Sequence, residues 1–86
     1  MKVTIYTTPN CVQCDSTKRQ FTRLNVPYEV VDLSSDEKAL EMVREMGYTA
    51  APVVIAGGQS WSGFRLERIK GVAKEMDAER VQNANL

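Results

Sequence analysis

The chain has 86 residues, enough for one domain with a single modest core, and it contains no histidine. Its eleven basic and eleven acidic side chains cancel, so its overall charge would not attract nucleic acid or an anionic membrane. The longest apolar run, from Ala50 to Ala56, is far too short to cross a bilayer. The N-terminal segment does not resemble a secretory signal. We therefore expect an unprocessed cytoplasmic protein, in a compartment that keeps thiols reduced.

The first half of the chain alternates between strand and helix patterns. β-Branched and aromatic residues predict a first strand over Val3–Tyr6, and the turn-forming residues after it end that strand. From Cys11 the apolar residues recur at helical spacing as far as Leu24, and we expect Pro27 to end this first helix. A second strand is predicted over Tyr28–Asp32.

A second helix is predicted next. Ser34 and Glu37 have the spacing of a capping box, which indicates where this helix begins. Gly47 is suited to end it, because glycine readily adopts the left-handed conformation of a C-terminal cap. Between them the apolar residues form a helical stripe, consisting of Ala39, Met42, Val43 and Met46.

The last third of the chain predicts a hairpin and a third helix. Short strands over Val53–Ile55 and Gln59–Trp61 flank a tight turn at Gly57 and Gly58. The third helix follows and carries its apolar face as far as Met76. We expect residues 1–76 to form the domain and the polar residues 77–86 to be a frayed tail.

The predicted order of elements is β-α-β-α-β-β-α, which indicates an α/β fold. The first three elements require a parallel strand pair with a right-handed crossover, and the last three close with an antiparallel hairpin. A four-stranded mixed sheet flanked by three helices, with helices on both faces, fits this order best.

The two cysteines, Cys11 and Cys14, allow three interpretations. A zinc or iron–sulfur site usually needs four thiolate or imidazole ligands, so this chain would have to share a site with a second chain. A structural disulfide would stabilise little, since the helix already orders the loop that it closes. A dithiol redox centre agrees best, because C-x-x-C after a strand in a βαβ unit is its specific signature.

The expected helix position gives each sulfur a different role. Cys11 lies where the first helix begins, so unpaired backbone N–H groups and the positive end of the helix dipole favour its thiolate, the attacking species. Cys14 lies one turn on, in line with Phe21 and Leu24, so we expect it to point inward. We expect Cys11 to attack a partner's disulfide and Cys14 to resolve the mixed disulfide.

Two further groups of residues keep two interpretations each. Val12 and Gln13, between the cysteines, are either filler in a helical turn or residues that set the redox potential and contact partners. The basic cluster of Lys18, Arg19 and Arg23 is either a solvated helix face, which we favour, or a surface that attracts an acidic partner.

Three segments, YTTPNCVQC, APVV and WSGFR, resemble the NrdH-type redoxins, which are small glutaredoxin-like members of the thioredoxin superfamily. The resemblance extends from Lys2 to about Lys74. It implies a thioredoxin-like fold and a monomer that donates electrons to class Ib ribonucleotide reductase. It also implies recharging by thioredoxin reductase, which draws on NADPH, with no cofactor bound to the redoxin itself.

The same resemblance implies roles for particular residues. Cys11 and Cys14 match the redox pair, and Pro52 matches a cis-proline that faces the dithiol, although an ordinary trans proline is the alternative. Trp61 and Phe64 match the segment near the active site. We expect a partly exposed Trp61 within a partner-docking patch, consisting of Val12, Gln13, Ala51, Pro52, Trp61 and Phe64.

Two positions depart from the family pattern. Many members have a lysine or arginine where this chain has Thr8. A cation at that position would stabilise the Cys11 thiolate and lower its pKa, and this chain lacks that contribution. Leu66 stands where family members commonly have a proline directly after Phe-Arg, and this difference affects only the start of the third helix. Val3–Thr8 also contains no acid, which leaves the proton acceptor for Cys14 open.

Two other functions remain as alternatives. A glutaredoxin reduced by glutathione usually has an acid-containing segment after its glycine pair, whereas Gly58 here is followed by QSWSGF, with no acid before Glu67. A dimeric metal- or cluster-binding module would use one C-x-x-C from each chain.

Overall fold

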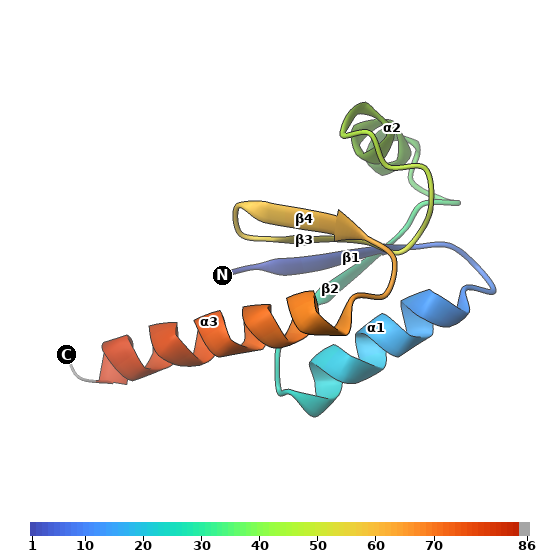
Figure 1. Ribbon diagram of the computed structural model, residues 1–86. Helices are drawn as coiled ribbons and strands as arrows, with labels where there is room; N and C mark the ends of the chain where they lie inside the picture. Colours follow the sequence, from blue (N-terminus) through green and yellow to red (C-terminus); the bar gives the residue numbers. More distant parts are fainter. Residues whose placement is uncertain (85–86) are drawn as a thin grey trace.

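The computed structural model describes the backbone of residues 1–84 and the side chains of residues 1–79. The predicted order of elements is confirmed (Figure 1): β1 (Val3–Thr7), α1 (Val12–Arg23), β2 (Glu29–Asp32), α2 (Glu37–Glu45), β3 (Val53–Ala56), β4 (Gln59–Ser62) and α3 (Leu66–Ala84). Within this described part of the chain, no helix combines the length and the apolar character needed to cross a membrane.

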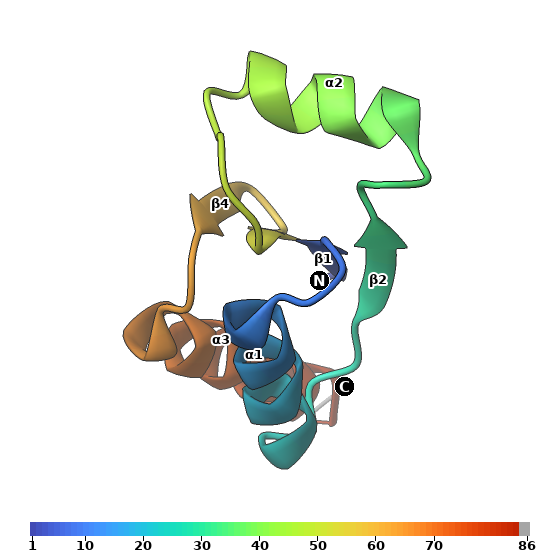
Figure 2. The ribbon, with the colours of Figure 1, turned by 90° about the vertical axis from the view of Figure 1, so that its right-hand side faces the viewer.

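The four strands form one mixed sheet in the order β2-β1-β3-β4. β1 pairs with β2 in parallel, whereas β1 with β3 and β3 with β4 pair antiparallel. Helices α1 and α3 cover one face of the sheet, and α2 lies on the opposite face (Figure 2). The prediction of a four-stranded mixed sheet with helices on both faces is therefore confirmed.

The core has two parts because side chains alternate between the faces of a strand. Val3 and Ile5 of β1 are buried in the larger cluster, beside Phe21 of α1 and Ile69 of α3. Tyr6, the residue after Ile5, points to the opposite face and packs with a smaller cluster formed by Leu33, Val43 and Val53 next to α2. The core thus fixes both layers of helices against one thin sheet.

Helix α1 ends earlier than Pro27, which corrects the predicted stop. Its last helical residue is Arg23, and Asn25 then adopts a left-handed conformation with φ of 58°. The N–H of Val26 bonds to the carbonyl of Phe21 at 2.9 Å, and that of Asn25 to Thr22 at 3.1 Å. These bonds form a Schellman cap, so the asparagine ends the helix before the proline is reached.

Helix α2 begins at a different cap from the predicted one. Asp36, rather than Ser34, is the N-cap, and its carboxylate accepts a hydrogen bond from the N–H of Ala39 at 3.0 Å. Ser34 is unavailable because its N–H and hydroxyl both donate to the carboxylate of Asp32, at 2.8 and 2.7 Å. Gly47 ends the helix as predicted, with a positive φ of 93°.

Helix α3 continues beyond Met76, where the sequence predicts a frayed tail. The helix runs to Ala84, and residues 77–84 contain neither proline nor glycine to interrupt it. The N-terminal ammonium lies 3.2 Å from the carboxylate of Glu79, which ties this part of α3 to the start of β1. Residues 85–86 of the predicted tail lie outside the described residues.

Candidate redox site

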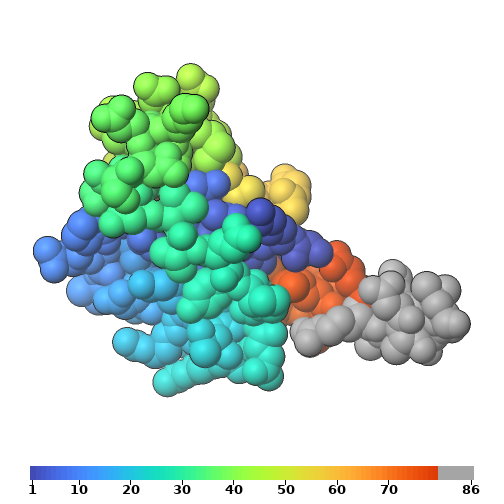
Figure 3. All heavy atoms as spheres, turned by 180° about the vertical axis from the view of Figure 1, so that it is seen from behind, coloured from blue at the N-terminus to red at the C-terminus, as the bar shows by residue number. Residues whose placement is uncertain are grey.

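Three connections meet at one end of the sheet: the β1–α1 loop, the segment before β3 and the β4–α3 loop (Figure 1). Figure 3, seen from behind, shows the start of α1 in blue at an edge of the molecule, below α2 in green. The eight residues predicted to form the redox pair and its docking patch belong to these connections or to the adjoining parts of α1 and β4. The fold therefore gathers residues that are far apart in the sequence.

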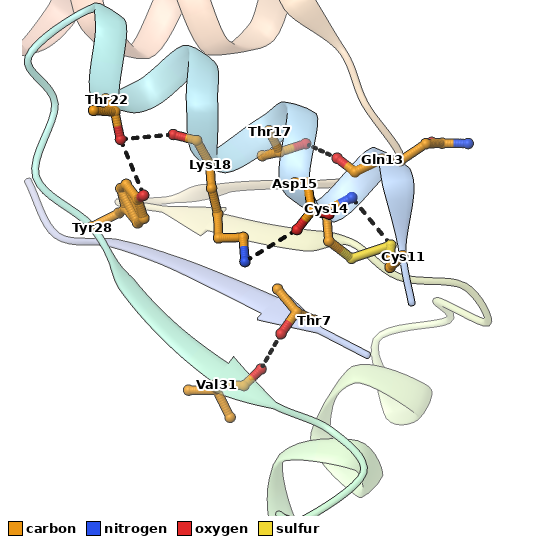
Figure 4. Close-up of polar contacts among 10 residues, drawn as sticks. All are labelled: Thr7, Cys11, Gln13, Cys14, Asp15, Thr17, Lys18, Thr22, Tyr28 and Val31. Atoms are coloured by element: carbon orange, nitrogen blue, oxygen red, sulfur yellow. Dashed lines mark hydrogen bonds and ion pairs between the residues drawn. A yellow bond between two sulfur atoms is a disulfide. The ribbon is translucent and has the colours of Figure 1, made fainter. Parts of the chain in front are cut away.

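Cys11 is the N-cap of α1 and forms a disulfide with Cys14 (Figure 4). Its backbone is extended, and its sulfur accepts a hydrogen bond from the N–H of Cys14 at 3.1 Å. This N–H is one of the donors that the first turn of a helix leaves unpaired. A charged sulfur at this position would accept the same bond more strongly and would lie at the positive end of the helix dipole.

Cys14 lies inside the protein, with 1% of its surface exposed, whereas Cys11 is half-buried. Thr17 and Phe21 follow Cys14 on the buried side of α1 and are fully enclosed. The predicted helix phase is thus confirmed: one sulfur lies near the surface and the other beneath it. A partner can reach Cys11 directly but can reach Cys14 only through Cys11.

The peptide bond between Ala51 and Pro52 is cis, as the resemblance implied. Pro52 is buried, and its carbonyl accepts a hydrogen bond from the N–H of Gly63 at 2.8 Å. The hydroxyl of Ser62 donates to the carbonyl of Ala50 at 2.7 Å. Two bonds thus hold the segment before β3 against the β4–α3 loop.

Gln13 connects the dithiol turn to that same loop. Its side-chain carbonyl oxygen accepts a hydrogen bond from the N–H of Phe64 at 3.0 Å. Gly63, just before, has φ of 86°, and a Cβ there would stand 3.4 Å from the same oxygen of Gln13. Gln13 therefore links two segments of the chain, a structural contact that neither interpretation of this residue included. Sequence reasoning missed Gly63, although glycine in the polar SGF turn was the available signal.

The predicted docking patch divides into exposed and buried members. Val12 is 78% exposed and Phe64 is 37% exposed, while Ala51 is half-buried. Trp61, in contrast, is only 2% exposed and belongs to the core cluster shared by α1 and α3. The expectation of a partly exposed tryptophan is wrong. Because Trp61 pairs in register with Val54, its ring faces the helices α1 and α3.

Charged side chains near the site come from α1 and α2 and not from the β1–α1 loop. Thr8 is exposed and supplies no charge next to Cys11. Arg44 of α2 lines a pocket together with Thr8 and Ala51. On α1, Lys18 forms an ion pair with Asp15, at 3.4 Å, whereas Arg19 and Arg23 are exposed.

The chain matches the glutaredoxin family over residues 3–61. It is 44% identical over 69 residues to the glutaredoxin-like protein NrdH of Escherichia coli, an alignment that covers 80% of this chain and 85% of that one. The NrdH protein of Lactococcus lactis is 31% identical over 71 residues, covering 83% and 99% of the two chains. The chain belongs to the NrdH-type, glutaredoxin-like redoxins.

Solved structures agree with this NrdH assignment. The NrdH-redoxin of Escherichia coli superposes with a TM-score of 0.80 at 43% identity, covering 81% of this chain and 92% of that one. A glutaredoxin from Archaeoglobus fulgidus superposes with a TM-score of 0.74 at 26% identity, covering 83% and 84%. The thioredoxin-like fold is confirmed. The protein is a small thiol–disulfide redox carrier of the NrdH type, with its cysteine pair at disulfide distance.

Proposed function

We propose that this redoxin is a dithiol electron donor that reduces protein disulfides, supplies class Ib ribonucleotide reductase and is recharged by thioredoxin reductase at the expense of NADPH. The observation that carries the proposal is the pairing of a half-exposed N-cap sulfur, Cys11, with a buried sulfur, Cys14, one turn away. This arrangement gives one thiol access to partners and keeps the other for an internal step.

The exchange proceeds in two displacements. The Cys11 thiolate attacks one sulfur of the partner's disulfide, forms a mixed disulfide and releases the partner's other sulfur as a thiolate, which takes up a proton. Cys14 then loses its proton and attacks the Cys11 sulfur. The second partner thiol leaves, and the Cys11–Cys14 disulfide remains. Two electrons have passed to the partner, and a reductase dithiol reverses the sequence on this chain.

A direct protein–protein encounter requires an accessible apolar surface around the reacting sulfur. Val12, Ala51 and Phe64 supply that surface, and the bond from Gln13 to Phe64 holds two of its parts in register. Pro52 and Trp61 support it from beneath, since both are buried. We therefore assign the docking contacts to the three exposed residues and a supporting role to the other two.

The relatives support the choice of electron source. The published description of the Escherichia coli NrdH-redoxin structure attributes a thioredoxin-like activity profile to that protein. We extend this activity to the present chain. We also propose a cytoplasmic location, where NADPH-dependent reductases act. The name NrdH on the similar proteins is also the basis for the proposed link to ribonucleotide reductase.

A glutathione-dependent glutaredoxin is the second candidate, and one observation favours it. Arg44 lines the pocket beside Ala51, where a carboxylate of a bound tripeptide would find a cation. The segment after Gly58 nevertheless has no acid to receive the tripeptide's amine before Glu67. Oxidation of NADPH through thioredoxin reductase, compared with oxidation through glutathione and its reductase, tests the proposal.

A further inference from the structure

An ion pair on α1 lies next to the dithiol. Asp15 follows Cys14 directly, and its carboxylate lies 3.4 Å from the ammonium of Lys18, one turn further on. The Asp15 side chain is 65% exposed and the Lys18 side chain 33% exposed. Figure 4 shows both on the side of α1 that carries the disulfide. The protein therefore holds one negative and one positive charge beside its reacting sulfurs.

Asp15 and Cys11 are one helical turn apart. The N–H of Asp15 donates to the carbonyl of Cys11 at 3.2 Å, the i to i+4 bond of a helix. Residues at this spacing lie over the same face, so charges on them interact. When the disulfide is reduced and Cys11 ionises, its new negative charge is one helical turn along the chain from the Asp15 carboxylate. The carboxylate then opposes the effect of the helix N-terminus, which favours the thiolate.

Lys18 offsets this opposition. Long side chains on a helix lean toward its N-terminus, so the Lys18 ammonium extends toward the dithiol rather than away from it. Other elements near the site bring Arg44 and Tyr48, which line the pocket with Thr8, and Arg65, whose Nε donates to the carbonyl of Ser62. Lys18 differs from these cations because it lies on the same helix as the two sulfurs and forms an ion pair with Asp15, the carboxylate that opposes the thiolate.

Asp15 is not suited to a second role, that of proton acceptor for Cys14. Cys14 lies inside the protein, with 1% of its surface exposed, whereas the Asp15 side chain is 65% exposed and pairs with Lys18. The Asp15 carboxylate therefore acts on Cys11 only through its negative charge.

We propose that the Asp15–Lys18 ion pair sets the acidity of the Cys11 thiol, with Asp15 disfavouring the thiolate and Lys18 cancelling that effect. The inference rests on the proposed role of Cys11 as the attacking sulfur. Asp15 and Lys18 act through Cys11 and need not touch the partner. Thr8 leaves the β1–α1 loop without a charge, so the pair on α1 is where this chain adjusts its nucleophile.

The test is a double-mutant cycle that removes the charge at each of the two positions. The variants Lys18→Met, Asp15→Asn and the double variant are made in a Cys14→Ser background, so that only Cys11 reacts with iodoacetamide. Below the pKa of the thiol, we expect Lys18→Met to slow alkylation and Asp15→Asn to speed it. Each change should be about two- to fivefold, the range for a charge in the first turn of a helix. The double variant should return close to the parent rate.

Three matched measurements separate this effect from a loss of structure. Lys18→Arg keeps the charge and should keep the parent rate, as should Lys38→Met, the same change on α2. In 1 M salt, where the Debye length is about 3 Å, the differences should shrink. Shifts of Lys18→Met and Asp15→Asn in the same direction, or no shift in either, would overturn the inference. Because alkylation needs no partner, a failure to accept electrons from thioredoxin reductase would instead overturn the proposed function alone.

Discussion

The side-chain oxygen of Gln13 accepts a hydrogen bond from the backbone N–H of Phe64, at 3.0 Å, between residues 51 positions apart in the chain. The neighbouring N–H of Gly63 continues the connection to the carbonyl of Pro52 at 2.8 Å. These two bonds join the dithiol turn, the loop before α3 and the proline segment before β3. The surface that a partner meets around Cys11 is therefore assembled from three parts of the chain that hold one another in place.

Replacing Gln13 by methionine should loosen this assembly without unfolding the protein. Methionine keeps the length of the side chain but has no carbonyl oxygen, so the Phe64 N–H must bond to water. A hydrogen bond contributes about 0.5–1.5 kcal/mol net, and we expect a destabilisation near the lower end because the site is exposed. Hydrogen exchange at the Phe64 amide should accelerate, and turnover with thioredoxin reductase should fall.

Gln20→Met provides the control, since it makes the same change two turns further along α1. We expect this variant to leave both the Phe64 exchange rate and turnover at their parent values. An unchanged Phe64 exchange rate in Gln13→Met would show that the hydrogen bond does not order the loop.

The two cysteines should give different products when each is replaced by serine. Cys11→Ser should lose disulfide reduction, because the remaining thiol is buried. Cys14→Ser should accumulate a mixed disulfide with the partner, because no internal thiol resolves it. Non-reducing electrophoresis and mass spectrometry measure the trapped complex. Trapping by Cys11→Ser and not by Cys14→Ser would reverse the assignment.

Trp61 should behave as a core residue rather than as a docking residue. Truncating a buried aromatic to alanine costs about 3–5 kcal/mol, a large share of the stability of a small domain, so Trp61→Ala should lower the melting temperature strongly. Trp61→Phe should lose less stability and retain turnover per folded molecule. Phe64→Ala, at an exposed position, should do the opposite: little loss of stability and a clear loss of turnover. Equal losses of turnover in Trp61→Phe and Phe64→Ala would contradict this division.

The Asp32 carboxyl should titrate below its usual pKa of 3.8, because the hydroxyl and then the N–H of Ser34 donate to it. A folded pKa below the unfolded one stabilises the fold at higher pH, and this contribution is lost as the pH falls below 3.8 and through the folded pKa. Ser34→Ala should raise the Asp32 pKa, as measured by nuclear magnetic resonance. Ser35→Ala should not, because that hydroxyl bonds to the Asp32 main-chain carbonyl, at 3.3 Å. Equal effects of the two variants would refute the assigned cause.

Sequence periodicity predicted the parts of the fold that depend on patterns within one element. The strand and helix order, the inward position of Cys14 and the stop at Gly47 all follow from local spacing or from one backbone conformation. The stop at Asn25 was missed because the proline two residues later looked stronger, although asparagine also tolerates the left-handed conformation.

The remaining errors have different causes. Ser34 was taken as a helix cap although Asp32, only two residues before it, is a local competing partner that accepts bonds from both its N–H and its hydroxyl. Trp61 was expected at the surface because the resemblance directed attention to docking, and QSWS, with a single apolar residue, has no alternation that shows which face of the sheet it occupies. The bond between Gln13 and Phe64 had no sequence signal, because neither residue reveals its partner 51 positions away.

The central claim, that electrons come from thioredoxin reductase, is tested most directly by NADPH oxidation with a protein disulfide as acceptor. One reaction contains thioredoxin reductase and the other contains glutathione reductase with millimolar glutathione, each with the same amount of redoxin. The apolar surface of Val12, Ala51 and Phe64 around Cys11 predicts rapid oxidation in the first and little in the second. Efficient turnover with glutathione and none with thioredoxin reductase would contradict the claim and place the protein among the glutathione-dependent glutaredoxins.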